Sequence, residues 1–283
     1  MTLAYLDGEF APLEDIRISP LDRGFLFADG VYEVVPVYAG RLLRRDAHLE
    51  RLARSLEAVR IEDPLGLAGW CALLDGIVER NGGGDQAVYF QVTRGAAPRE
   101  HAFPASTAAT VFAMTRLRCG MQDTPALEAI TRPDIRWGRC DIKSVALLPN
   151  VLMRQEAADA SASEAIFIRD GAVTEGTATN VFVVDGEGVR TPPKSTNILG
   201  GVTRDLLLEL MAAAGIECRE TTVPEQALRG AAEVWVSSST KEVAPVVRLD
   251  GAPVGDGVPG ALWERVHGLF QDYKQRLVRG ELD

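Results

Sequence analysis

The change of hydrophobic spacing at Asp46 is the feature that most constrains how this chain can fold. The residues before it contain two expected β-hairpins, which turn at Asp7-Gly8 and near residues 39–40. From Asp46 onwards leucines recur every three or four residues. We therefore predict an amphipathic helix that Asp46 caps and that carries Arg51 on or near its polar side. Strands and helices must share this chain.

The same periodicities predict the remaining elements and two domains. A chain of 283 residues is long for a single hydrophobic core. We place the boundary in the aperiodic residues 117–124, which gives an N-terminal domain of residues 1–118 and a C-terminal domain of residues 119–283. The predicted elements are a helix that ends at residues 82–84, strands at 86–93 and 110–115, a helix from 149 to about 160, a hairpin at 165–174, a strand at 180–184, a helix capped by Thr203, strands at 233–237 and 243–249, and a helix at 259–277.

Charge and composition exclude several functional classes. The net charge of -10 and the pI near 5.0 argue against a nucleic-acid partner, which needs a clustered basic surface. No segment approaches the roughly 18 apolar residues that a membrane helix requires, and the N-terminus lacks a signal-peptide pattern, so we expect a cytoplasmic protein with no membrane partner. The four cysteines and three histidines are scattered, which predicts neither a disulfide framework nor a metal site.

Lysine is scarce, and one lysine stands in an unusual position. Only four of the 30 lysine and arginine residues are lysines. A lysine in place of an arginine suggests amine chemistry, because a guanidinium stays protonated and cannot form a Schiff base at neutral pH. Lys143 lies near apolar Ile142 and Val145, and desolvation favours the neutral form of an amine. The alternative interpretation is a structural lysine paired with an acid.

Two further stretches could serve an anionic, ring-containing ligand. Glu175 precedes a run of small hydroxyl residues, and a carboxylate beside a pyridine nitrogen would keep that nitrogen protonated. Residues 199–203 lead into the predicted helix at Thr203, where backbone N–H groups and the helix dipole would favour a phosphate. Residues 237–240 offer a second possible phosphate contact. Each stretch could equally be an ordinary polar turn.

These residues together carry a family resemblance. Lys143 in Asp-Ile-Lys-Ser, Glu175 in Thr-Glu-Gly-Thr-Ala-Thr-Asn, the Leu-Gly-Gly-Val-Thr-Arg segment at 199–204 and the early Asp-Gly-Val-Tyr-Glu segment at 29–33 occur in a characteristic order. The chain resembles the class IV, or fold type IV, aminotransferases that use pyridoxal 5'-phosphate (PLP), over nearly its whole length. Within that class it is most similar to the enzymes that act on D-amino acids, on the segments 22–35, 90–101 and 134–144.

The resemblance implies a fold and an activity. The fold would be α+β, with a smaller N-terminal α/β domain and a larger C-terminal pseudo-barrel domain that binds the cofactor. The protein would be a homodimer that transfers an amino group between D-alanine-like amino acids and 2-oxo acids such as 2-oxoglutarate. The alternatives of the same fold are a branched-chain L-amino acid aminotransferase, an amine transaminase and aminodeoxychorismate lyase. An alternative of another class is an anion-binding protein without catalysis.

The resemblance also implies roles for individual residues. Lys143 would form the Schiff base with the cofactor and move the proton, and Glu175 would pair with the pyridine nitrogen. Tyr32, Arg99 and His101 would hold the substrate carboxylate, with the Arg99 loop supplied by the neighbouring subunit. The remaining cofactor-binding positions, in the phosphate cradle or near the cofactor ring, would be Arg51, Arg136, Thr179, Leu199, Val202, Thr203, Ser239 and Thr240.

Overall fold

The computed structural model describes residues 2–117 and 125–282, which form two compact units. Unit 1 comprises Met1–Met121, Ile142–Ala146 and Leu277–Asp283, and unit 2 comprises Gln122–Asp141 and Leu147–Arg276. The domain boundary predicted between residues 118 and 119 lies outside the described residues. Among the described residues, no helix combines the length and the apolar character needed to cross a bilayer.

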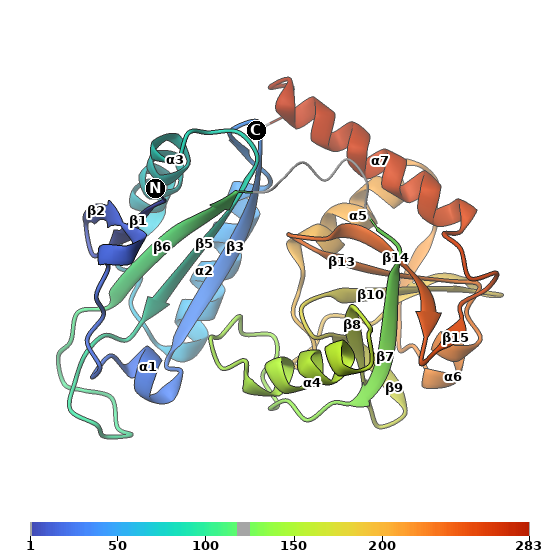
Figure 1. Ribbon diagram of the computed structural model, residues 1–283, viewed down its shortest axis with the longest axis horizontal. Coiled ribbons are helices and arrows are strands. Elements are labelled where there is room, and N and C mark those ends of the chain that lie inside the picture. Colours follow the sequence, from blue (N-terminus) through green and yellow to red (C-terminus); the bar gives the residue numbers. More distant parts are fainter. Residues whose placement is uncertain (1, 118–124, 283) are drawn as a thin grey trace. The chain divides into compact units, whose positions relative to one another are not determined.

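Unit 1 is built on a six-stranded sheet in the order β2-β1-β6-β5-β3-β4, in which each strand runs antiparallel to its neighbours (Figure 1). Both hairpins expected from the sequence are present, β1–β2 and β3–β4. The elements are β1 (Leu3–Leu6), β2 (Glu9–Pro12), the short 3-10 helix η1 (Leu13–Asp15), α1 (Arg23–Phe27), β3 (Gly30–Tyr38), β4 (Arg41–Leu42), α2 (Arg45–Val59), α3 (Gly66–Arg80), β5 (Gln86–Thr93) and β6 (Thr110–Leu117).

Alternation along β3 decides what each face of this sheet contacts. Val31, Val35 and Val37 are fully buried and pack with the leucines of α2 and with Trp70 of α3 in one hydrophobic core. Each such side chain contributes roughly 1.5–3 kcal/mol on burial. Glu33 shares the spacing of these valines, so its carboxylate points to the same helix-covered face.

The start of α2 differs from the prediction. The helix begins at Arg45, and its N-cap is Arg44 in a left-handed conformation, so Asp46 lies in the first turn and does not cap it. Arg51 is only 5% exposed, whereas the sequence placed it on or near the polar side. The reason is tertiary: Glu33, on the buried face of β3, draws the guanidinium inward.

Unit 2 is built on a nine-stranded mixed sheet in the order β12-β11-β10-β13-β14-β7-β8-β9, with β15 paired to β14. A link of three residues, 177–179, joins β9 at one edge to β10 in the interior. Because so short a link cannot cross a flat sheet, the sheet curls into a partial barrel. The elements are β7 (Leu127–Pro133), α4 (Leu148–Asp159), β8 (Glu164–Arg169), β9 (Ala172–Gly176), β10 (Asn180–Asp185), β11 (Gly188–Thr191), α5 (Val202–Ala213), β12 (Cys218–Glu220), α6 (Glu225–Arg229), β13 (Glu233–Ser238), β14 (Glu242–Leu249), β15 (Ala252–Pro253) and α7 (Ala261–Val278).

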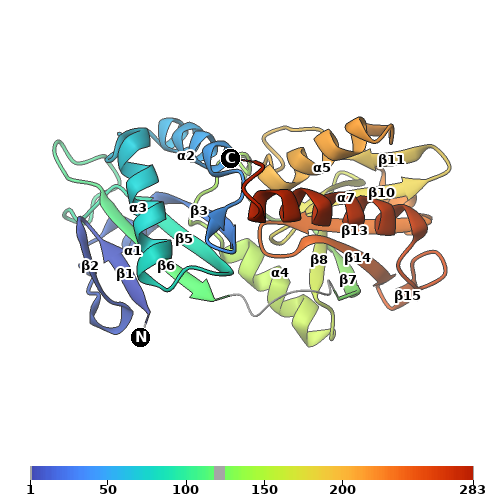
Figure 2. The same ribbon diagram turned by 90° about the horizontal axis from the view of Figure 1, so that it is seen from above.

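Helices cover the curled sheet. Figure 2 shows α5 and α7 beside each other, and Arg265 of α7 donates a hydrogen bond of 2.9 Å to the carbonyl at Ala214, directly after α5. The helix α4 packs on β7 and β8 through Met153 and Ala157.

Candidate functional site

Lys143 lies at a strand edge of unit 1. Because β4 pairs only with residues 37 and 38 of β3, the edge at residues 30–32 is available to another segment. Ser144 forms an antiparallel bridge with Val31, and the N–H of Tyr32 donates to the carbonyl of Lys143 over 2.9 Å. The Lys143 amine lies 4.3 Å from the centre of the Tyr32 ring. Backbone pairing thus fixes the segment that carries the amine and sets it beside an aromatic face.

Arg51 belongs to a buried ion cluster. Its Nε and Nη2 donate to Glu33 Oε1 and Oε2 over 2.7 and 2.8 Å, and His48 Nδ1 lies 2.8 Å from the same carboxylate. Burial raises the pKa of Glu33, but the charge of Arg51 and the hydrogen bonds outweigh burial and leave the pKa far below its usual range. Glu33 therefore stays charged in the core and orients the guanidinium.

His48 completes this cluster. Burial lowers the pKa of His48 more strongly than the hydrogen bond to Glu33 raises it. The imidazole is thus neutral at neutral pH, and the net charge of the three side chains is zero. Such a cluster is tolerated in a core because each charge has a bonded partner.

The three predicted carboxylate-binding residues have different neighbours within unit 1. Tyr32 projects from β3 beside Tyr89, with ring centres 5.5 Å apart. Arg99 and His101 are exposed and gather around Phe27, the last residue of α1. The Arg99 guanidinium carbon lies 5.3 Å, and the His101 ring centre 5.4 Å, from the centre of the Phe27 ring. Arg99 and His101 therefore lie on one loop and contact the same aromatic ring.

Glu175 lies in β9 of unit 2 and is 6% exposed. One carboxylate oxygen accepts from Arg136 Nη1, and the other accepts from the N–H of Leu199 over 3.0 Å. Arg136 also donates to both oxygens of the buried Asp134, over 2.8 and 2.9 Å. Two carboxylates thus fix the guanidinium, and the guanidinium fixes Glu175.

Electrostatics reinforce this arrangement. Burial lowers the pKa of Arg136, but Asp134 and Glu175 more than compensate and raise it above its ordinary value. Burial raises the pKa of Asp134, but the hydrogen bonds and the charge of Arg136 together lower it by more. The pKa of Asp134 therefore lies below its usual range. Both groups therefore remain charged at neutral pH.

One asparagine connects Glu175 to the start of α5. Asn180 Nδ2 donates to the carbonyl of Leu199 over 2.8 Å and lies 3.4 Å from Glu175 Oε2. The helix begins at Val202 with Gly201 as its N-cap, and no side chain caps it. Thr203 is therefore the second helical residue, which corrects the prediction that it caps the helix. An uncapped start leaves the first backbone N–H groups for an anion.

Thr179 is tied to a second buried carboxylate, Glu164, which is 1% exposed. Its hydroxyl donates to Glu164 Oε2 over 3.2 Å, while Oε1 accepts from both the hydroxyl and the N–H of Thr177. Glu164 therefore shapes the short link between β9 and β10. The link in turn places Glu175 and Asn180 at its two sides.

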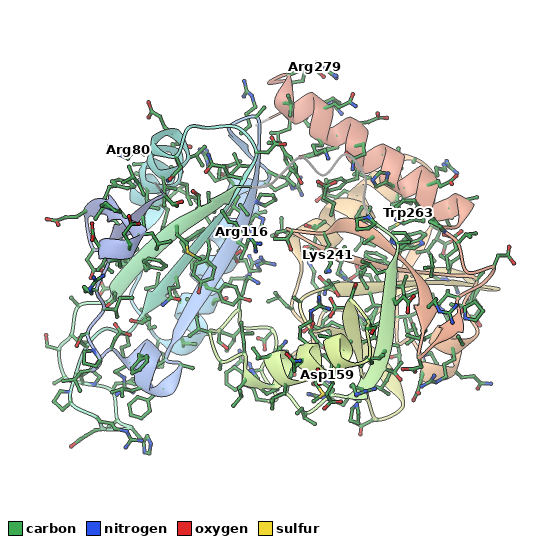
Figure 3. The ribbon with its side chains drawn as sticks, in the orientation of Figure 1. Arg80, Arg116, Asp159, Lys241, Trp263 and Arg279 are labelled. Atoms are coloured by element: carbon green, nitrogen blue, oxygen red, sulfur yellow. The ribbon has the colours of Figure 1, made fainter. Side chains whose placement is uncertain are left out.

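Ser239 and Thr240 form the turn between β13 and β14. The preceding Ser237 pairs with Asn180 across β10 and β13, so the turn follows the strand end beside Asn180. Within the part of the chain that the structure describes, Ser237 Oγ is buried without a hydrogen-bond partner. Lys241, labelled in Figure 3, is the last residue of this turn, and burial lowers its pKa more than nearby Glu164 raises it.

Known proteins are similar in sequence to this chain over nearly its whole length. The family model described as amino-transferase class IV matches residues 30–249. The chain belongs to the class IV aminotransferase family. It is 42% identical over 268 residues to a D-alanine aminotransferase of Bacillus licheniformis, and the matched region covers 94% of this chain and 95% of that protein. It is 36% identical over 278 residues to a D-alanine aminotransferase of Staphylococcus epidermidis, and the matched region covers 97% of this chain and 99% of that protein.

A solved structure shows the same fold for this class IV aminotransferase. The branched-chain amino acid aminotransferase from Escherichia coli superposes with a TM-score of 0.88 at 23% identity, over 100% of this chain and 96% of that chain. This likeness confirms the predicted α+β, fold type IV architecture. It concerns the fold and not the substrate.

Sequence reasoning named candidate site residues of this class IV aminotransferase but missed the residues that hold them. Glu33 and Asp134 orient the two arginines, Asn180 connects Glu175 to α5, and Glu164 holds Thr179. A signal for Glu33 exists, because its position in the alternation Val31, Glu33, Val35 puts a charge on a buried face. Among residues 2–117 and 125–282, no cluster of three or more His, Cys, Asp or Glu side chains could hold a metal ion.

Proposed function

We propose that this protein is a PLP-dependent aminotransferase that exchanges amino groups between D-alanine-like amino acids and 2-oxo acids such as 2-oxoglutarate. The observation that carries the proposal is the fixed position of Glu175. Arg136 and the Leu199 N–H hold this carboxylate next to the start of α5. A partner for a pyridinium and an anion site for a phosphate are thereby joined in one bonded network. Relatives at 42% and 36% identity carry the name D-alanine aminotransferase.

The residues of unit 2 fit the cofactor. Glu175 would accept the pyridinium N–H, and the backbone from Leu199 to Thr203 would take the phosphate together with Ser239 and Thr240. Arg51, which belongs to unit 1, would be a further phosphate-binding residue. The buried Ser237 hydroxyl, which lacks a partner among the described residues, could be satisfied by a polar group of a bound molecule. Arg136 would fix Glu175, and Thr179 would keep the β9–β10 link in place.

The bound cofactor would supply the electron sink that makes the proton on the substrate α-carbon acidic. Lys143 would be the covalent attachment point, and its amine would carry the proton between the α-carbon and the C4' position. Arg99 would bind the substrate carboxylate bidentately, and Tyr32 and His101 would complete its hydrogen bonds. The side from which the proton is removed would decide whether D- or L-amino acids react.

The test offers D-alanine and L-alanine separately with 2-oxoglutarate and measures the pyruvate formed. We expect turnover of D-alanine. Selective turnover of L-alanine or of a branched-chain L-amino acid would reject the substrate class and leave the family activity. Turnover of neither substrate, in a colourless protein that does not take up PLP, would favour an anion-binding role.

Two lysine variants test the attachment point. Lys143→Ala should abolish borohydride-stable labelling by PLP and the visible absorbance of bound cofactor. Lys241→Ala is the matched control, because Lys241 is also a partly buried amine, next to the Ser239–Thr240 turn. Labelling that survives in Lys143→Ala and disappears in Lys241→Ala would reassign the attachment point.

A further inference from the structure

Arg23 is a buried arginine that holds the loop carrying Arg99 and His101. It is 3% exposed and lies in the first turn of α1. Its guanidinium donates to the carbonyls of three consecutive loop residues, Glu100, His101 and Ala102, over 2.5, 3.3 and 3.4 Å. A planar guanidinium can bind several acceptors in one fixed geometry.

The loop has little regular structure of its own. Residues 97–109, all of which the structure describes, form neither helix nor strand. The hydrogen bond within the 98–102 segment joins the N–H of Glu100 to the carbonyl of Pro98 over 2.8 Å. The position of Arg99 and His101 therefore depends on groups outside the loop, of which Arg23 makes the most numerous bonds.

Arg23 is itself anchored to the core. Its Nε donates to Asp29 Oδ2 over 2.8 Å, and Arg94 donates to both oxygens of the same carboxylate over 2.8 and 3.0 Å. Arg94 also donates to the carbonyls of Val59 and Arg60 at the end of α2 over 2.7 and 2.9 Å. The loop is thus connected through two arginines and one aspartate to the C-terminal end of α2.

The Phe27 ring contacts the side chains of Arg23, Arg99 and His101. The Arg23 guanidinium carbon lies 4.8 Å from the centre of the Phe27 ring, and Arg99 and His101 contact that ring at similar distances. Arg23 therefore orients the loop backbone by hydrogen bonds and its two functional side chains through a shared aromatic ring.

We propose that Arg23, with Asp29 as its anchor, is a positioning residue for substrate carboxylate recognition by Arg99 and His101. The proposal rests on the proposed function, because it assigns Arg23 a role only through that recognition. Its functional group touches the loop backbone and not the substrate. Loss of Arg23 should therefore weaken the binding of both amino acid and 2-oxo acid, which present the same carboxylate.

The first experiment measures amide hydrogen exchange in the PLP-loaded protein by mass spectrometry. In Arg23→Gln we expect faster exchange in peptides that cover residues 98–104. Arg17→Gln is the matched control, because the exposed Arg17 also donates to two backbone carbonyls, that of Glu14 in η1 and that of Ile16. Equal exchange in Arg23→Gln and the wild type would overturn the positioning role, whether or not the protein turns over D-alanine.

The second experiment measures steady-state kinetics with D-alanine and 2-oxoglutarate. Arg23→Gln should raise both KM values roughly 10- to 100-fold, because a small displacement of a binding group is costly, and should change kcat less. Arg23→Lys keeps the charge near Asp29 but loses the planar fork, so we expect an intermediate KM from a protein that retains the ion pair.

A double-mutant cycle separates positioning from general stability. If Arg23 acts through Arg99 and His101, the fold increase in KM caused by Arg23→Gln should be clearly smaller in an Arg99→Ala background, where only His101 remains to be positioned. Additive effects, or unchanged KM values in a variant whose loop exchanges faster, would overturn the proposal. A wild-type protein without aminotransferase activity would instead reject the proposed function, and the exchange data would then decide the role of Arg23 in the loop alone.

Discussion

Asp134 fixes the position of Glu175 indirectly, through Arg136. Its carboxylate is fully buried, accepts hydrogen bonds from Arg136 and from the hydroxyl of Thr174 at 2.9 Å, and forms an ion pair with Arg169 at 3.1 Å. These bonds set the plane of the Arg136 guanidinium, which in turn holds Glu175. The position of Glu175 is therefore set by a residue that does not touch it.

The variant Asp134→Asn should show a pH-dependent loss of stability. The pKa of Asp134 in the folded protein lies below its unfolded value near 4, so its ionisation stabilises the fold at higher pH, and this stabilisation is lost as pH falls through the lowered pKa. We expect a loss of about 3 kcal/mol at pH 7, because a buried charge pair is broken. Urea unfolding of the wild type and of Asp134→Asn at pH 7 and below pH 4 measures this loss. A difference in the free energy of unfolding that is the same at both pH values would contradict the expected pH dependence.

The variant Glu33→Gln should weaken PLP binding through Arg51. It preserves the side-chain shape but removes the charge that orients the guanidinium, and a hydrogen bond to a charged group contributes about 1.5–3 kcal/mol. The dissociation constant for PLP should therefore rise roughly 10- to 100-fold, as measured by absorbance titration. Glu50→Gln, on the exposed side of α2, is the control and should bind PLP like the wild type. An unchanged constant in Glu33→Gln would separate Arg51 from the phosphate.

At the scale of elements, the junction between β10 and α5 depends on two adjacent glycines that face different surroundings. A Cβ at Gly201 would lie 2.0 Å from Asn180 Oδ1, whereas a Cβ at Gly200 would first meet Lys194 at 3.6 Å, an ordinary contact. Asn180 is the side chain that connects Leu199 to Glu175. The close approach at Gly201 is therefore part of the site.

A pair of alanine variants tests this junction. Gly201→Ala should displace Asn180, lower the affinity for PLP by roughly tenfold and reduce the melting temperature, as expected when a side chain is forced into a packed region. Gly200→Ala should leave both quantities close to those of the wild type. Equal effects of the two substitutions would show that helix capping, and not the contact with Asn180, makes glycine necessary.

Local periodicity explains which elements could be predicted from the sequence. The strand over residues 86–93 and the hairpin at 165–174 follow from alternation and from Asp-Gly turn chemistry, which act within a few residues. The short strands β11 and β12 were not predicted individually, because they have only four and three residues. The caps predicted at Asp46 and Thr203 were wrong because each helix begins two residues earlier than a cap at these positions requires.

The site was predictable only as far as motifs mark it. Lys143 and Glu175 stand in recognisable segments, whereas Glu33 is 18 residues from Arg51 and 15 from His48 in sequence. Whether side chains so far apart in sequence meet depends on how α2 packs on β3, and composition and spacing do not reveal this packing. Arg23 was passed over for the same reason, because its acceptors in the loop lie 77 to 79 residues away.

At the scale of the whole molecule, the expected homodimer makes a prediction about which chain supplies Arg99. If the loop acts on the site of the neighbouring subunit, mixed dimers of Lys143→Ala and Arg99→Ala chains contain one site with both an intact lysine and an intact arginine. The assay uses a low substrate concentration, at which the raised KM of Arg99→Ala leaves it, like Lys143→Ala, with little activity. Unfolding and refolding the two variants together should then restore about a quarter of the wild-type activity, since half of the random dimers are mixed. No recovery, with mixed dimers demonstrated by differential tagging, would show that each chain uses its own loop.

The division of unit 1 into three separate stretches of sequence has a consequence for biosynthesis. Its sheet is complete by residue 117, but the segment that covers the edge of β3 at residues 30–32 lies at Ile142–Ala146, which is synthesised after the strands of the sheet. A nascent chain can therefore form the strands early while that edge still lacks its partner. The segment that carries Lys143 would then dock on β3 after the strands of unit 1 have paired. The Lys143 amine would thus reach its position beside Tyr32 only after the sheet has formed.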